Sequence, residues 1–133
     1  MPELPEVETV RRGLNRVSLH QPVRGGAVRL ARTIAFPEAA DDFLKGVKNT
    51  WLERWHRRGK YLMAELLSGS ASEPVSAGWL GVHLRMTGQL LWVSQKEPVQ
   101  THCRVRLFFD DERELRYVDQ RTFGRLWWVP PGK

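Results

Sequence analysis

The chain has 133 residues, 41% hydrophobic and 27% charged, and its 21 Lys and Arg against 15 Asp and Glu give a net charge of +6. This composition indicates one folded domain rather than a disordered chain, because six Trp and five Phe can supply a core. No stretch reaches the ~18 uncharged apolar residues of a membrane span, and the acidic N-terminus lacks the basic region of a signal peptide.

The chain is predicted to begin with a helix over residues 5–17. Pro5 suits its first turn, where a backbone N–H has no partner within the helix. Apolar residues recur every three or four positions and predict an inward-facing stripe: Leu4, Val7, Val10, Leu14 and Val17. A strand is expected around Ala27–Ile34, after two glycines, and a second short helix over Glu38–Val47.

The rest of the chain is rich in aromatic and branched residues, which predicts successive strands. Their expected ranges are Trp51–His56, Tyr61–Leu67, Trp79–Leu84, Gln89–Val93, Arg104–Phe109, Glu114–Val118 and Arg125–Val129. Ser68–Gly78 is expected to form a flexible hairpin loop. The predicted class is α+β, mainly β: an antiparallel β-sandwich with an N-terminal helix and a second short helix. Residues 1–129 are expected to form the domain, and 130–133 the start of a linker.

Cys103 is the only cysteine, so no internal disulfide can form, and this favours a reducing, cytoplasmic compartment. The four histidines are scattered without metal-ligand spacing. No metal or other cofactor is therefore expected within this chain. The basic excess favours a polyanionic partner such as nucleic acid.

The N-terminus carries the groups best suited to covalent chemistry. Proline at position 2 normally permits removal of the initiator Met, which leaves a secondary amine that is partly neutral at physiological pH. Such an amine can attack an electrophilic carbon and form an iminium ion. Glu3 and Glu6 lie near enough in sequence to transfer protons. The alternative is that Pro2 is merely a processed terminus and that the glutamates only stabilise the start of a helix.

The segment MPELPEVETVRRGL closely resembles the start of the bacterial formamidopyrimidine-DNA glycosylases, which excise oxidised purines from DNA. Three further segments follow in the order found in that family. Residues 58–62 (RGKYL) resemble its lysine strand, residues 83–88 (HLRMTG) its methionine loop, and residues 119–124 (DQRTFG) its arginine–phenylalanine loop. The resemblance extends from Met1 to about Trp128.

This resemblance implies a catalytic role for the N-terminal residues. The amine of Pro2 would attack C1′ of the damaged nucleotide, and Glu3 would act as general acid on the opening sugar ring. Strand scission by β-elimination would follow from the iminium ion. Glu6 would position the base or a water molecule, and Lys60 would lie near the lesion phosphate and assist elimination.

The same resemblance implies DNA-binding roles for four residues: Met86, His102, Arg121 and Phe123. His102 and Arg121 match positions that contact DNA, and both side chains can donate to phosphate oxygens. Met86 and Arg121 would fill the gap left by an extruded base, and Phe123 would wedge beside the orphaned partner base. Core packing is the alternative for Met86 and Phe123.

The implied partner is double-stranded DNA with an oxidised purine or an abasic site, bound by a monomer in a bacterial cytoplasm, associated with the nucleoid. In that family a helical DNA-binding domain and a zinc finger follow the N-terminal domain, so zinc is expected only outside these residues. Two other functions stay open: a non-catalytic basic nucleic-acid-binding β-domain, and a tautomerase that uses its N-terminal proline as a base. The Arg121 and Phe123 pair argues against the tautomerase, which has no need of a wedge.

Overall fold

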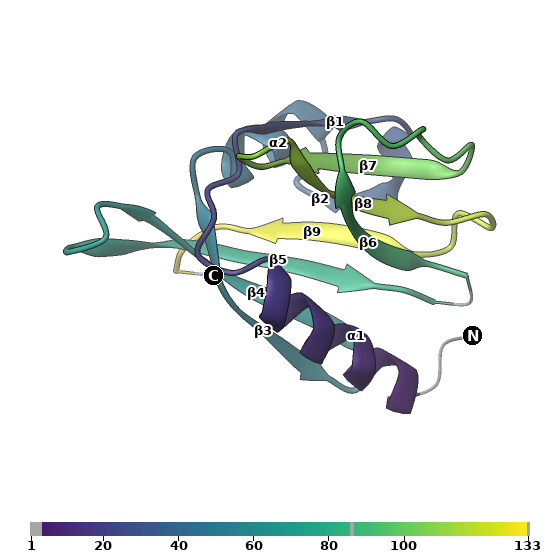
Figure 1. The fold of residues 1–133 in the computed structure, drawn as a ribbon, viewed down its shortest axis with the longest axis horizontal. Coiled ribbons are helices and arrows are strands. Elements are labelled where there is room, and N and C mark those ends of the chain that lie inside the picture. The colour runs from purple at the N-terminus through teal and green to yellow at the C-terminus, as the bar shows by residue number, and fades with distance from the viewer. Residues whose placement is uncertain (1–3, 86, 133) are drawn as a thin grey trace.

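The computed structural model describes residues 4–85 and 87–132, and the side chains of residues 4 and 5 lie outside this description. Within these ranges nine strands form two sheets that enclose a common core, accompanied by two α-helices (Figure 1). This arrangement confirms the predicted mainly β sandwich. Pro2, Glu3 and Met86, three of the predicted site residues, lie outside the described residues.

The strand order is β1-β7-β8-β6 in the four-stranded sheet and β2-β9-β5-β4-β3 in the five-stranded sheet. Neighbouring strands pair antiparallel except β2 and β9, which pair parallel. The strands are β1 (Gly25–Val28), β2 (Ile34–Phe36), β3 (Trp51–Arg58), β4 (Tyr61–Gly69), β5 (Pro74–His83), β6 (Gln89–Ser94), β7 (Cys103–Phe108), β8 (Arg113–Val118) and β9 (Arg125–Val129).

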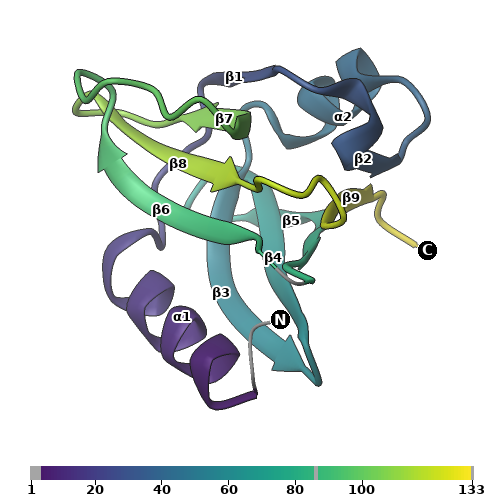
Figure 2. The same cartoon turned by 90° about the vertical axis from the view of Figure 1, so that its right-hand side faces the viewer.

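The two helices lie at the two lateral openings of the sandwich (Figure 2). Helix α1 (Leu4–Val17) packs against β3, β4 and β6, at the edge where β3 and β6 end the two sheets. Helix α2 (Ala40–Val47) packs against β1 and β2 at the opposite edge, and also contacts β5 and β9. Each helix therefore shields apolar side chains that the space between the sheets would otherwise expose to water.

The inward face of α1 follows the predicted stripe for most of its length. Val7 and Leu14 are buried, and Val10 packs against the core. The prediction is wrong for Val17, which is 45% exposed. Ser18, directly after the helix, faces inward instead: its hydroxyl donates to the Leu14 carbonyl and accepts a hydrogen bond from the indole of the fully buried Trp55.

Two sequence predictions about strands need correction. Ala27–Ile34 is not one strand, because β1 and β2 are separated by a short 3₁₀ helix over Ala31–Thr33. The chain changes sheets here: β1 pairs with β7 and β2 with β9. Ser68–Gly78 is not a loop either, since β4 and β5 continue their pairing to Gly69 and Pro74. Backbone hydrogen bonds maintain this hairpin although its serine-rich sequence has little strand preference.

The core is one continuous cluster to which both sheets and both helices contribute. Leu62, Leu80 and Leu126 come from the five-stranded sheet, and Val105 and Leu115 from the four-stranded sheet. The sandwich with its shared core provides a rigid body whose turns can hold functional side chains in place.

No helix in the described part of the chain is long and apolar enough to cross a membrane.

Candidate functional site

Three of the segments singled out in the sequence meet at one end of the five-stranded sheet. Tyr61 on β4 pairs with His83 on β5, and His83 pairs in turn with Arg125 on β9. The 58–62 segment, the 83–88 turn and the 119–124 loop therefore adjoin the same end of three neighbouring strands, β4, β5 and β9. The N-terminal end of α1 points toward the same end of the molecule (Figures 1 and 2). Strand pairing thus places Tyr61, His83 and Arg125 in one row across the sheet, although Tyr61 and Arg125 are 64 positions apart in the sequence.

His83 lies at the centre of this row and is only 8% exposed. Its Nδ1 accepts a hydrogen bond from the Arg85 backbone N–H at 3.2 Å, and the Tyr61 ring packs edge-on at 4.4 Å between centroids. Burial lowers the pKa of His83, and the positive charges of Arg85 and Lys60 lower it further. His83 is therefore a neutral imidazole, with Nδ1 as acceptor, beside the half-buried Lys60 of the β3–β4 turn.

Asp119 joins the 83–88 turn to the 119–124 loop. Its Oδ1 accepts from the Thr87 hydroxyl at 2.5 Å and from the Arg121 N–H at 3.3 Å. Its Oδ2 accepts from the Tyr117 hydroxyl and from the Gly124 N–H, both at 2.8 Å. Burial would raise the pKa of Asp119, but these donors outweigh burial and hold the pKa below its ordinary value. The carboxylate is thus a buried, charged acceptor at neutral pH.

Tyr117 supports this carboxylate from the core. It is buried, and its pKa is raised strongly by burial and by the neighbouring Asp119, so its hydroxyl remains a donor. Two glycines pack directly on that hydroxyl. A Cβ added to Gly124 would overlap it, and one added to Gly88 would lie 2.7 Å from it. Both loops therefore approach Tyr117 more closely than a chain with side chains at these positions allows.

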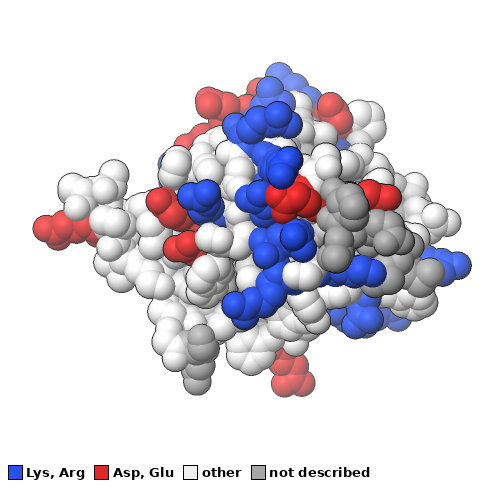
Figure 3. Space-filling model, turned by 90° about the horizontal axis from the view of Figure 1, so that it is seen from below, with Lys and Arg blue, Asp and Glu red and all other residues white. Residues whose placement is uncertain are grey.

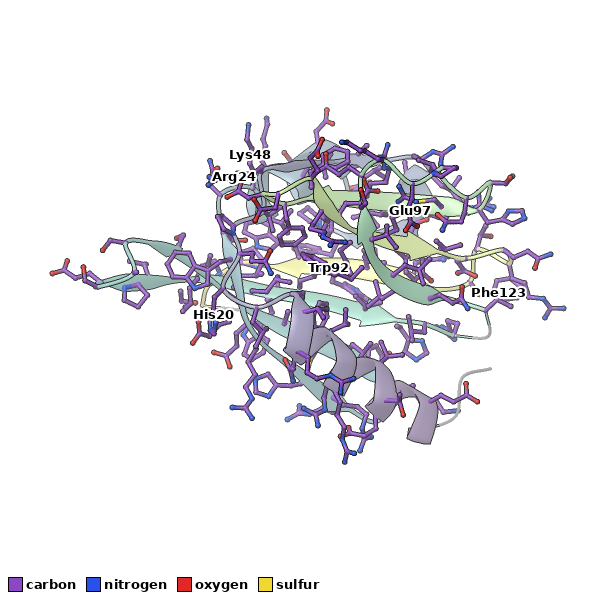
Figure 4. All side chains as sticks on the ribbon, in the orientation of Figure 1. His20, Arg24, Lys48, Trp92, Glu97 and Phe123 are labelled. Carbon is purple, nitrogen blue, oxygen red and sulfur yellow. The ribbon has the colours of Figure 1, made fainter. Side chains whose placement is uncertain are left out.

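The predicted DNA-binding residues of the described chain lie on this framework. Phe123 is 53% exposed and projects from the end of the molecule that carries the β8–β9 loop (Figure 4). Arg121 is exposed in the same loop. The carbonyl of His102 accepts a hydrogen bond from the Asp119 N–H at 3.0 Å, so the start of β7 lies against this loop as well. Because the Phe123 side chain is exposed, core packing is excluded for it.

Arginine side chains attach the start of α1 to the end of β3. Glu8 accepts hydrogen bonds from Arg11 and Arg12 on its own helix and from Arg57 on β3 at 3.0 Å. The hydrogen bonds from Arg11 and Arg57 hold the pKa of Glu8 far below its usual range. Lys and Arg atoms form a band across this face, with acidic atoms inside it (Figure 3). Glu6, in contrast, is exposed in the first turn of α1.

Sequence reasoning missed three residues that organise this site. Asp119 and His83 belong to the recognised segments, but nothing in their spacing indicates burial or hydrogen-bond partners. Glu8 pairs with Arg57 on a strand 49 positions away, and no sequence spacing indicates that contact. Among the described residues, no group of three or more His, Cys, Asp and Glu side chains could hold a metal ion.

The fold and the site define a two-sheet β-sandwich domain with a helix at each lateral edge and with charged and aromatic turns gathered at one end. Residues 1–126 match the model of the formamidopyrimidine-DNA glycosylase N-terminal domain, and the chain belongs to this family.

Relatives at higher and lower identity agree with this assignment. The chain is 61% identical over 132 residues to a formamidopyrimidine-DNA glycosylase of Nostoc punctiforme and 60% identical over 131 residues to one of Acaryochloris marina. It covers 44% and 45% of these relatives, so it spans less than half of their length. The fold matches Lactococcus lactis Fpg in complex with abasic-site-containing DNA, with a TM-score of 0.84 and 28% identity. That match covers 98% of this chain and 44% of the Lactococcus chain.

Proposed function

We propose that this chain is the proline-bearing part of a base-excision-repair DNA glycosylase and AP lyase that removes oxidised purines such as 8-oxoguanine and formamidopyrimidines. The observation that carries the proposal is the meeting of the lysine, methionine and arginine–phenylalanine segments along the row Tyr61–His83–Arg125. Family membership supports it. Structures of the Lactococcus relative with abasic-site DNA and with Fapy-dG-containing DNA support damaged double-stranded DNA as the partner.

The proposed reaction begins at the amine of Pro2 after removal of Met1. The nitrogen forms a bond to C1′ as the bond between C1′ and the damaged base breaks, and Glu3 protonates the ring oxygen as the sugar opens. The product is an iminium ion. This cation acidifies the C2′ proton, and loss of that proton expels the 3′ phosphate by β-elimination. Lys60 would balance the phosphate charge, and Glu6 would orient the base or a water molecule.

The loops would supply the DNA distortion that the chemistry requires. A base inside a duplex is inaccessible, so the enzyme must extrude the nucleotide and fill the gap. Phe123 is an exposed aromatic side chain on a loop, which suits a wedge between bases. Arg121 and Met86 would occupy the vacated space, and His102 would contact phosphate. The net charge of +6 favours approach to DNA and predicts binding that weakens with salt.

An excision assay tests the proposal. The protein at its full natural length is incubated with a duplex containing one 8-oxoguanine, with an undamaged duplex as control. We expect release of the oxidised base and strand scission at that site only. Phe123→Ala should lower excision, whereas Val75→Ala, which truncates an exposed apolar residue on the distant hairpin, should not.

The same assay separates the two other functions. A non-catalytic nucleic-acid-binding domain would bind both duplexes and leave the damaged strand intact. A proline-based tautomerase would act on a small acid and neither bind nor cleave the DNA. Either result, obtained with protein whose Met1 has been removed, contradicts the proposed function.

A further inference from the structure

Asp119 binds backbone and side-chain donors from both the β5–β6 turn and the β8–β9 loop. Its carboxylate is bound by donors from Thr87, Arg121 and Gly124, in addition to Tyr117 beneath it. In the sequence Thr87 follows Met86 directly, and Gly124 follows Phe123 directly. Each loop donor therefore is, or adjoins, one of the three residues assigned to DNA insertion. The hydroxyl of Thr87 also accepts from the Arg121 N–H at 3.2 Å, which closes the network.

The two side chains at the centre of this network are shielded from water. Asp119 is 1% exposed, and Tyr117 is also 1% exposed. The carbonyl of Asp119 accepts from Arg104 at 3.0 Å, and its N–H donates to the His102 carbonyl. The backbone before the loop tip is thus held at Asp119, and the Gly124 N–H, which donates to the Asp119 carboxylate, holds the backbone after the tip. Thr122 at the tip adopts a left-handed conformation with φ of 61°. A charged acceptor buried among several donors is a strong local constraint.

Insertion into a stacked duplex places a particular demand on loops. Each wedge side chain must reach its position against the resistance of base stacking, and an error of about 1 Å in position can cost on the order of 100-fold in rate. Two independent loops would have to be ordered separately, at a separate cost in conformational entropy. A common anchor removes one of these costs because both loops are held in one arrangement before DNA binds.

We propose that Asp119 is a positioning residue that fixes Thr87 of the β5–β6 turn and the β8–β9 loop in one arrangement, so that Arg121 and Phe123 enter the duplex together. This inference rests on the proposed glycosylase function. Asp119 does not touch the reacting atoms in this scheme. It acts through the backbone of the two loops, which distinguishes it from Lys60 and the N-terminal residues.

The test compares a reaction that needs insertion with one that does not. Excision of 8-oxoguanine from a duplex requires base extrusion, whereas scission at an abasic site in single-stranded DNA requires the Pro2 amine but no invasion of a base stack. We expect Asp119→Asn and Thr87→Val to lower duplex excision by roughly 10- to 100-fold and to leave single-strand scission near the wild-type rate. A 2-aminopurine beside the lesion should report slower unstacking in both variants.

Thr50→Val is the matched control. Thr50 is buried, and its hydroxyl donates to the Val47 carbonyl at 2.7 Å in a region that contributes nothing to the Asp119 network. It should leave both reactions and the fluorescence change unaltered. If Asp119→Asn fails to fold, Thr87→Val decides the question, since it removes one hydroxyl from the network and leaves the carboxylate in place.

Two results would overturn the inference: an equal loss of both reactions in Thr87→Val, which indicates a merely structural role, or unchanged duplex excision and unstacking. Wild-type protein that performs neither reaction would contradict the proposed function itself and the inference with it. A wild type active in both reactions, with variants that do not separate them, contradicts only the role of Asp119.

Discussion

The imidazole of His83 is surrounded by groups that oppose its protonation. It is 8% exposed, it accepts a hydrogen bond from the Arg85 N–H, and Arg85 and Lys60 contribute positive charge nearby. Its pKa is therefore lowered, mainly by burial. A neutral histidine here keeps the row Tyr61–His83–Arg125 free of a further positive charge next to Lys60.

This shift predicts a pH dependence of stability. In the unfolded chain His83 takes up a proton near its ordinary pKa of 6.5, but in the folded protein it does so only at lower pH. The unfolded state binds more protons in that interval, so the free energy of unfolding should fall as the pH drops below 6.5. Urea unfolding at several pH values between 7.5 and 5 measures this change in the free energy of unfolding. His83→Gln should flatten this slope relative to wild type, and an unchanged slope would refute the assignment.

Single residues also show what sequence can predict about the site. The wedge role that the resemblance implies for Phe123 requires an exposed side chain, and Phe123 is 53% exposed. The partners of Asp119 could not be predicted, because Thr87 is 32 positions away and meets it only through sheet register. The catalytic and DNA-binding roles of all the predicted site residues stay predictions, and Pro2, Glu3 and Met86 in addition lie outside the described part of the chain.

At the next scale, strand β8 secures the long connection between β6 and β7 through a buried charge network. Glu114 and Arg116 are both fully buried and joined at 2.5 Å, and Arg106 also donates to Glu114. The Arg116 guanidinium donates further to the carbonyls of Pro98 and Glu97. Burial would raise the pKa of Glu114, but the two arginines outweigh burial and lower it. The connection that leads to His102 is thus held by charged groups.

Glu114→Gln should therefore destabilise the protein strongly. Removal of one partner leaves Arg116 as a buried charge without its counterion, which typically costs about 3–5 kcal/mol. Urea unfolding at pH 7 measures this change. The control is Glu112→Gln, which breaks the solvent-exposed pair with Lys96 and should leave the midpoint almost unchanged. Similar midpoints for the two variants would show that the buried network does not stabilise the fold.

The elements show where sequence patterns are sufficient. Helix α1, helix α2 and most strands lie close to their predicted ranges because their apolar periodicity reflects the face they bury. The hairpin of β4 and β5 extends beyond the prediction because strand pairing is a property of two backbones and does not need branched residues. The division of residues 27–34 between two sheets could not be predicted either, because it depends on the pairing partners β7 and β9, which lie more than 70 positions further along the chain.

At the scale of the whole molecule, the sandwich brings four sequence segments to one end. Sheet register aligns the 58–62, 83–88 and 119–124 segments, and the pair of Glu8 and Arg57 attaches the start of α1 to the end of β3. None of these segments could form the site alone, since each contributes only a turn or a helix end. The order of the motifs in the sequence indicated the family, and the fold accounts for how separated motifs act in one place.

The central claim is that the N-terminal amine of Pro2 attacks the sugar of damaged DNA, and borohydride trapping tests it most directly. The protein at its full natural length is incubated with a duplex containing an abasic site, reduced with borohydride, and digested for peptide mapping. We predict a covalent adduct on the peptide that begins with Pro2. Protein that retains Met1 should give none, because its proline nitrogen is then a tertiary amide. An adduct on another residue, or no adduct from processed protein that binds the DNA, would contradict the account.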